Sequence, residues 1–233
     1  MGGQACVFYG AAQVSKDVDF LILADEGNYE RLLAAMSELQ APRIAVPPFA
    51  ARFLERGHAA HFRCQAEGVE GLRIDVMTQL RDLPGFDYLW DRRTSYSDET
   101  GMVYDLLSIP DLVLAKKTQR NKDWPVIELL ANIHFEENHA APTPEWIQFW
   151  LREIRTPEHL KSLVEKFPSE SDSILAERPL LQLAMEKQDD ALQTALDAEM
   201  RAEQAKDRIY WEPLKREMEE FRREHARKLR DES

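Results

Sequence analysis

The sequence predicts an α+β fold: a small mixed β-sheet with flanking helices, followed by a helical C-terminal region. Up to about residue 107, short apolar runs typical of strands alternate with helical patterns. Beyond it, helical patterns follow one another between prolines, and from residue 186 the chain is dense in charge, with no glycine and one proline. We therefore expect an α/β core over residues 1–107, a helical region packing on it over residues 108–185, and a charged helical tail over residues 186–233.

The composition predicts a globular, cytoplasmic protein. The 233 residues can bury a sizeable core, and 44% hydrophobic with 31% charged residues is typical of such chains. No apolar stretch approaches the ~20 residues of a membrane span, and the N-terminus lacks the pattern of a secretion signal. Cys6 and Cys64 lack zinc-type spacing, so we expect reduced, buried thiols. The net charge of -12 argues against a general nucleic-acid coat.

Periodicity and turn residues predict the elements of the first part. The helical repeat is clearest in YERLLAAMSEL, where apolar residues recur three and four positions apart. The expected elements are a helix over residues 3–10 closed by Gly10, a buried strand over Val18–Leu23, a helix over Tyr29–Leu39, a helical piece around Phe49–Arg56, strands over His61–Ala66 and Leu72–Met77, and a strand over Met102–Leu107.

The second part begins with a helix-start signal. Ser108 and Asp111 have the spacing of a capping box and precede the helical pattern DLVLAKKTQR. Further helices are expected through about residue 185, and the tail predicts one or two long exposed helices. Within the tail, Leu214, Met218 and Phe221 stand four and three residues apart, an apolar face that fits a partner helix.

Carboxylates mark the first candidate site, in the stretch SKDVDFLIL. Asp17 and Asp19 should project from one face of a strand, about 7 Å apart, and repel each other unless a cation lies between them. In GLRIDVM, Asp75 should point away from its apolar neighbours. If the two strands are neighbours, three carboxylates converge, and Mg²⁺ binds such oxygens together with waters and substrate phosphates. Two ions close together can activate a hydroxyl and stabilise a leaving phosphate.

Other residues suit phosphate binding. Gly2 and Gly3 allow backbone N–H groups to approach a phosphate, and the Ser15 hydroxyl can reach a phosphate oxygen. Lys116 and Arg120 are expected on one face of the helix that begins after Ser108. Their charges suit a triphosphate, although a solvated basic face at a helix end is the alternative interpretation. His58 and His61 lack further metal ligands nearby, so we expect surface or core histidines.

The string of a Gly-Gly pair, Asp-x-Asp and a later acid resembles the signature of the nucleotidyltransferase superfamily that shares the DNA polymerase β palm. The segment from Lys116 to Asp123 is similar to a helix of bacterial abortive-infection and toxin-type nucleotidyltransferases. The resemblance covers about residues 2–130 and implies a palm fold. It also implies that Asp17, Asp19 and Asp75 hold Mg²⁺ or Mn²⁺, that Asp75 helps to activate the acceptor, and that Gly2, Gly3, Ser15, Lys116 and Arg120 contact nucleotide phosphates.

The resemblance implies transfer of a nucleoside monophosphate from a nucleoside triphosphate to an acceptor hydroxyl, with release of pyrophosphate. The acceptor stays open among an RNA end, a protein hydroxyl and a small molecule. The main alternative is a catalytically weak or inactive binding module, such as a toxin–antitoxin partner that uses its C-terminal helix. Gln13, where many toxin-type relatives carry a basic residue, favours this alternative. So does a start at the glycine pair, where relatives usually have a strand upstream. A third hypothesis is a metal-dependent phosphohydrolase that uses the same three aspartates to activate water.

Overall fold

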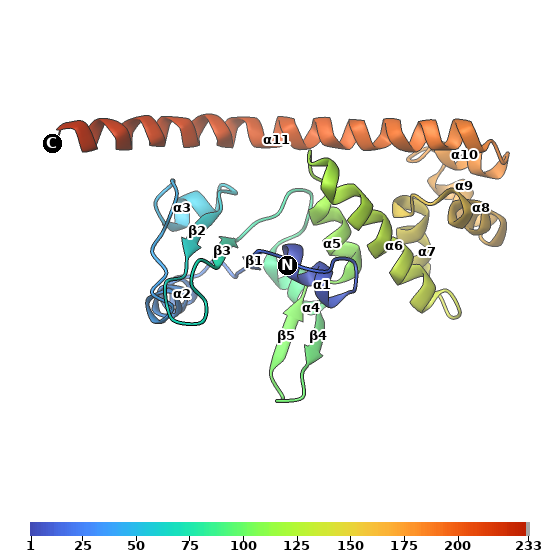
Figure 1. Ribbon diagram of the computed structural model, residues 1–233. Helices are drawn as coiled ribbons and strands as arrows, with labels where there is room; N and C mark the ends of the chain where they lie inside the picture. Colours follow the sequence, from blue (N-terminus) through green and yellow to red (C-terminus); the bar gives the residue numbers. More distant parts are fainter. Residues whose placement is uncertain (232–233) are drawn as a thin grey trace. The chain divides into compact units, whose positions relative to one another are not determined.

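The computed structural model describes residues 1–231 and divides into two compact units, each with its own hydrophobic core (Figure 1). The first unit comprises Met1–Ala115 and the chain from Arg208 onward, and the second comprises Lys116–Asp207. The mixed α+β class with small sheets and a helical C-terminal region is confirmed. The three-part division expected from the sequence differs from these units, because the tail contributes to both, and it stays a prediction.

The first unit contains most of the β structure. Its elements are α1 (Gly2–Phe8), β1 (Asp17–Leu21), α2 (Glu26–Glu38), α3 (Ala51–Leu54), β2 (Ala60–Arg63), β3 (Arg73–Met77), α4 (Phe86–Asp91), β4 (Thr94–Ser97), β5 (Val103–Leu106) and α5 (Ile109–Lys116), whose last residue belongs to the second unit.

A three-stranded mixed sheet forms the centre of the first unit (Figure 1). Its order is β1-β3-β2, with β1 parallel and β2 antiparallel to β3. Phe62, Ile74 and Val76 are buried and belong to one core cluster with Met36 of α2. The expected strand Val18–Leu23 is present as β1, but it is not buried: its residues are half-exposed and Phe20 is 44% exposed. A strand at the edge of a sheet has fewer neighbours to cover it.

A second sheet is formed by β4 and β5, which pair antiparallel. The Asp98 carboxylate closes the connection by accepting from the backbone N–H groups of Thr100 and Met102 and from the hydroxyls of Thr100 and Tyr104. Only β5 was expected from the sequence, because TSYS in β4 lacks apolar alternation.

The predicted helix start at Ser108 is confirmed, with one of the two hydrogen bonds of a capping box. The Ser108 hydroxyl lies 3.4 Å from the Asp111 backbone N–H and donates to the Asp111 carboxylate over 2.7 Å. The Arg92 guanidinium donates to both oxygens of the same buried carboxylate. The helix ends at Lys116, and Arg120 precedes a separate 3₁₀ turn, η1 (Asn121–Asp123). The expectation that Lys116 and Arg120 share one helical face was therefore wrong.

The second unit is helical. Its elements are η1, α6 (Trp124–Asn138), α7 (Pro144–Glu153), α8 (Pro157–Lys166), α9 (Pro168–Ile174), α10 (Leu180–Met185) and the first part of α11 (Asp189–Asp231). Three of the prolines that punctuate this part of the sequence are the first residues of α7, α8 and α9. Proline suits that position because its missing N–H would have no partner within the helix. The core gathers around Trp150 and Leu151, both fully buried.

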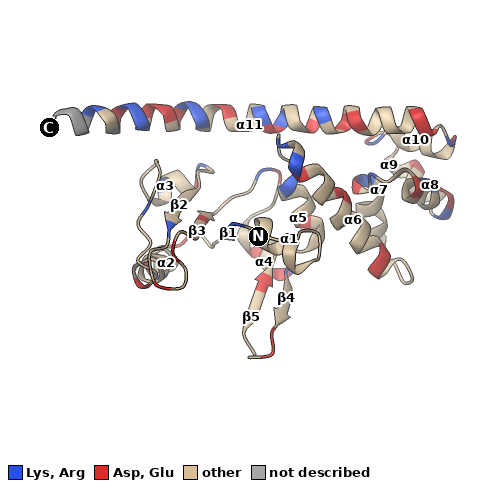
Figure 2. Ribbon diagram, in the orientation of Figure 1, with Lys and Arg blue, Asp and Glu red and all other residues tan. Residues whose placement is uncertain are grey.

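The charged tail forms one helix, α11, in which Lys and Arg alternate with Asp and Glu (Figure 2). In the first unit the apolar face expected to meet a partner contacts α3 of the same chain. The ring centroids of Phe221 and Phe53 lie 5.0 Å apart, and Leu214 is buried. Beside them, Glu217 accepts from the ring of buried His58 over 2.8 Å and pairs with Arg56.

The structure bears on the expectations for the two cysteines and for membrane spans. Cys6 and Cys64 are free and buried, as predicted. Among the residues that the structure describes, no helix has both the length and the apolar character to cross a membrane.

Replacing Ser108 by alanine removes the cap of α5 and one donor to buried Asp111. We expect Ser108→Ala to lower the free energy of unfolding by about 0.5–2 kcal/mol, measured by urea denaturation. Ser37→Ala, an exposed change within α2, is the matched control and should leave that free energy nearly unchanged. Equal stability of the two variants would contradict the capping role.

Candidate functional site

Three carboxylates lie together on neighbouring strands of the first unit. The parallel register of β1 and β3 places Asp19 beside Asp75 and Asp17 beside Arg73. Since side chains two residues apart share a face of a strand, Asp17, Asp19 and Asp75 project to the same side of the sheet. The neighbouring strands thus bring the three predicted acids into one cluster, which we call the acid cluster.

The electrostatics of Asp19 reflect this crowding. Its pKa is raised above the ordinary aspartate value, mainly because burial disfavours the charged form and then because Asp17 and Asp75 repel a further negative charge. A raised pKa means that an ionised Asp19 is held in an unfavourable field. A cation at this position would relieve it.

The glycine pair and Ser15 contact the acids directly. Gly2 has a φ of +66°, and a Cβ atom there would lie 1.8 Å from Asp19 Oδ2, so only glycine fits. The N–H of Gly3 points at Asp19 Oδ2 over 3.4 Å. The hydroxyl of Ser15 lies 3.0 Å from the backbone oxygen of Asp17 and 3.1 Å from its Oδ1. Three of the residues predicted to bind phosphate, Gly2, Gly3 and Ser15, therefore line the acid cluster.

Asp75 is held differently, by two residues that the sequence analysis did not assign to the site. The Arg73 guanidinium donates from Nε to Oδ1 over 2.7 Å and from Nη2 to Oδ2 over 2.8 Å. The ring of His61 on β2 also approaches Oδ1, with Nδ1 2.7 Å away. Burial alone would raise the pKa of Asp75, but the hydrogen bonds from His61 and Arg73 outweigh it and hold the pKa below the ordinary value.

These two residues carried a signal in the sequence. Arg73 stands two positions before Asp75 in the same strand, so both side chains project to one face. His61 faces Asp75 across the antiparallel pair β2–β3. The sequence alone does not reveal this contact, because it depends on the register of the two strands. His61 was expected to be a surface or core histidine, and the structure instead places it at the acid cluster.

Asp17 and Asp75 add to the negative field around the Asp19 carboxylate, so a divalent cation bound beside Asp19 would relieve that field. Asp75 in this arrangement offers both oxygens to Arg73. Among the described residues no group of three or more His, Cys, Asp or Glu side chains is arranged to hold a metal ion. A cation that binds Asp75 would therefore compete with Arg73 for its two oxygens.

Lys116 and Arg120 lie in the second unit and surround another acid. Arg120 Nε donates to Asp123 over 2.8 Å, and Lys116 Nζ lies 3.8 Å from the same buried carboxylate. The hydroxyl of Thr118 also donates to Asp123. Lys116 and Arg120 thus form an ion-pair cluster within their own unit, and their role at a phosphate stays a prediction.

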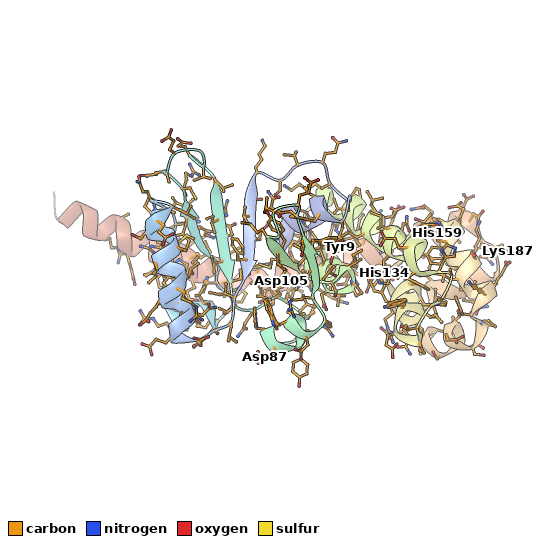
Figure 3. All side chains as sticks on the ribbon, turned by 90° about the horizontal axis from the view of Figure 1, so that it is seen from below. Tyr9, Asp87, Asp105, His134, His159 and Lys187 are labelled. Atoms are coloured by element: carbon orange, nitrogen blue, oxygen red, sulfur yellow. The ribbon has the colours of Figure 1, made fainter. Side chains whose placement is uncertain are left out.

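His58 and His134 have structural roles. His58 is buried against Glu217 in the first unit. In the second unit His134 lies within α6 and accepts from the Trp150 indole over 2.9 Å (Figure 3). Burial lowers the pKa of His134, which favours the neutral ring that this bond requires. His134 is therefore a core residue of α6.

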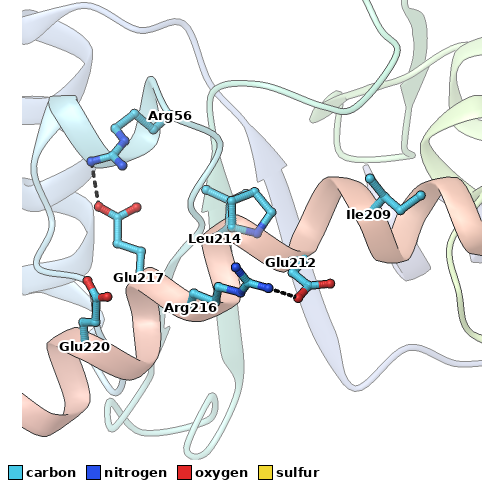
Figure 4. Close-up of a pocket in the computed structure, with 8 residues that line it drawn as sticks. Arg56, Ile209, Glu212, Leu214, Arg216, Glu217 and Glu220 are labelled. Carbon is cyan, nitrogen blue, oxygen red and sulfur yellow. Dashed lines mark hydrogen bonds and ion pairs between the residues drawn. The ribbon is translucent and has the colours of Figure 1, made fainter.

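A cavity of about 530 Å³ lies beside α11 in the first unit (Figure 4). It is lined by Arg56, Ile209, Glu212, Pro213, Leu214, Arg216, Glu217 and Glu220. Its charged groups are largely paired with one another, Arg56 with Glu217 and Arg216 with Glu212. The acid cluster does not line this cavity.

Asp19 and Asp75 should respond oppositely to neutralisation. Because the pKa of Asp19 is raised, its ionisation destabilises the fold at neutral pH, and Asp19→Asn should increase the free energy of unfolding by about 0.5–1 kcal/mol. The pKa of Asp75 is lowered, so its ionised form stabilises the fold above the unfolded-state pKa. Asp75→Asn should lower the free energy by about 1–3 kcal/mol at pH 7.

Urea denaturation across pH measures both effects. The deficit of Asp75→Asn should vanish as the pH falls through the folded-state pKa of Asp75, where the wild-type carboxyl is itself protonated. Destabilisation by Asp19→Asn at pH 7 would show that the acid cluster is not under electrostatic strain.

Comparison of this chain with protein-family models, with curated proteins and with solved structures gave no match.

Proposed function

We propose that this protein is a metal-dependent nucleotidyltransferase built on a polymerase β-like palm. The observation that supports it is the position of Asp19, between Asp17 on its own strand and Asp75 on the next, with the Gly2–Gly3 backbone against it. Carboxylates in that arrangement suit Mg²⁺ or Mn²⁺. Bound there, the metal would lower the pKa of an attacking hydroxyl and offset charge on the phosphates.

The residues of the chain take defined roles in this proposal. Asp17 and Asp19 would hold the cation, and the cation would hold the phosphates. Ser15 orients Asp17 through its hydroxyl, and the Gly3 N–H either supports Asp19 or turns to a phosphate oxygen. Asp75 accepts the proton of the acceptor hydroxyl or adds a third ligand, so that the nucleoside monophosphate moves to the acceptor and pyrophosphate leaves.

One observation favours the alternative of a weak or inactive binding module. Arg73 neutralises Asp75 from within the chain, so the fold satisfies part of its own acid cluster without a metal. In that case the protein would act by contact with a partner, such as the other member of a toxin–antitoxin pair. The two proposals differ in whether nucleotide binds in a metal-dependent manner.

Calorimetric titration with each of the four ribonucleoside triphosphates, with and without Mg²⁺, separates them. Metal-dependent binding that disappears in the Asp17→Asn/Asp19→Asn double variant supports the transferase and identifies the preferred base. Absence of binding to the folded wild-type protein under all these conditions supports the binding module.

Asp17→Asn should reduce nucleotidyl transfer at least about 100-fold, because it removes a charged ligand where charge develops in the transition state. Transfer is measured as release of pyrophosphate in the presence of the nucleotide identified above. Asp87→Asn is the matched control, since Asp87 is an exposed aspartate of α4 in the same unit (Figure 3). Near-normal transfer by a folded Asp17→Asn protein would remove Asp17 from the site.

A further inference from the structure

Arg73 is a cation that the acid cluster already contains. Its guanidinium bonds to both oxygens of Asp75, its Nη2 lies 3.1 Å from the His61 ring, and Asp17 and Asp19 are close enough to add to the field around it. The N-terminal ammonium is a second cation in this field, and three carboxylates against two cations still leave an excess of negative charge. Arg73 and a metal would therefore be attracted to the same place and would compete for the same Asp75 oxygens.

The arginine is placed so that it can leave. Its side chain is 42% exposed, and among the described residues Nη1 has no protein partner. Asp75, by contrast, is only 8% exposed, so leaving its charge without a partner would cost stability. The guanidinium can therefore leave without that cost only when another cation takes its place at Asp75.

A released guanidinium would remain beside the candidate metal site. Arg73 lies at the first position of β3, paired in register with Asp17. The planar fork that binds the two Asp75 oxygens has the geometry to bind two oxygens of a phosphate. A substrate that brings both a divalent cation and a triphosphate therefore offers Arg73 a new partner while it removes the old one.

We propose that Arg73 is an exchangeable ligand: a divalent cation displaces it from Asp75, and the freed guanidinium binds the triphosphate of the nucleotide. This inference rests on the proposed function and assigns a phosphate-binding role to Arg73 within it.

The test measures two affinities in the absence of turnover. Mn²⁺ alone and inorganic triphosphate with Mn²⁺ are titrated into the full chain by calorimetry. Arg73→Gln should bind Mn²⁺ about tenfold more tightly than wild type, because the competitor is gone, and should bind triphosphate about tenfold more weakly, because a charge-assisted contact is lost. Arg73→Lys keeps the charge without the bidentate fork and should fall between the two proteins.

Two controls define the outcome. Arg92→Gln removes a second bidentate arginine, the partner of buried Asp111, and should change neither affinity. Asp75→Asn in the Arg73→Gln background should abolish the gain in Mn²⁺ affinity. Circular dichroism confirms that each variant is folded.

Each result bears on a separate claim. Equal Mn²⁺ affinity of wild type and Arg73→Gln would overturn the exchange while the proposed metal site stands. Tighter Mn²⁺ binding with unchanged triphosphate affinity would overturn the phosphate role. Failure of every folded protein to bind Mn²⁺ would overturn the exchange and the proposed function together, whereas the predicted shifts without nucleotidyl transfer would overturn only the function.

Discussion

The parallel pairing of β1 with β3 is the constraint on which the site depends. It aligns Asp19 with Asp75 and places Asp17 beside Arg73, so the same backbone hydrogen bonds that build the sheet also gather like charges. Buried apolar residues on the other side of the sheet favour this pairing, with Ile74 and Val76 nearly inaccessible. Formation of the core thus brings the three carboxylates together on the opposite face of the sheet, where they repel one another. The side chains around that face reduce this repulsion.

The repulsion is handled differently at Asp75 and at Asp19, which are paired on neighbouring strands. At Asp75 the chain provides its own countercharge and hydrogen bonds, and the carboxylate is stabilised as an anion. At Asp19 no arginine is supplied, and the carboxylate is held at a raised pKa. Acidic residues with a shifted pKa that the fold does not neutralise are characteristic of functional sites, although structural ion-pair networks also shift pKa values. The raised pKa of Asp19 therefore makes it the principal candidate residue of the site.

The sequence predicted the parts of this arrangement that follow from local pattern. The helix at YERLLAAMSEL, the helix start at Ser108 and the apolar strand of Asp75 each depend on neighbours within a few residues, and each is present. The strand β4 was missed because its polar residues are ordered by pairing with β5 and not by a buried face. The break after Lys116 was missed because the basic run continued a helical pattern, whereas buried Asp123 gathers the residues after it into a turn.

The site was predictable to the same extent. Asp-x-Asp and the later acid stand out as residue types, but the partners of Asp75 depend on register, which no single stretch of sequence specifies. The sequence around a carboxylate in a strand looks the same whether that carboxylate binds a metal or forms an ion pair with an arginine. Only the geometry of Arg73 and His61 distinguishes these states, and it shows that the three acids, similar in sequence, are not equivalent.

The close contact of Gly2 with Asp19 has a consequence for how this chain can vary. Any residue larger than glycine at position 2 would occupy the volume of the Asp19 carboxylate. The two positions are thus linked sterically: a bulkier residue at one requires a smaller one at the other. In a collection of diverged copies, covariation between positions 2 and 19 would therefore mark the chains that have given up the carboxylate, and with it the acid cluster.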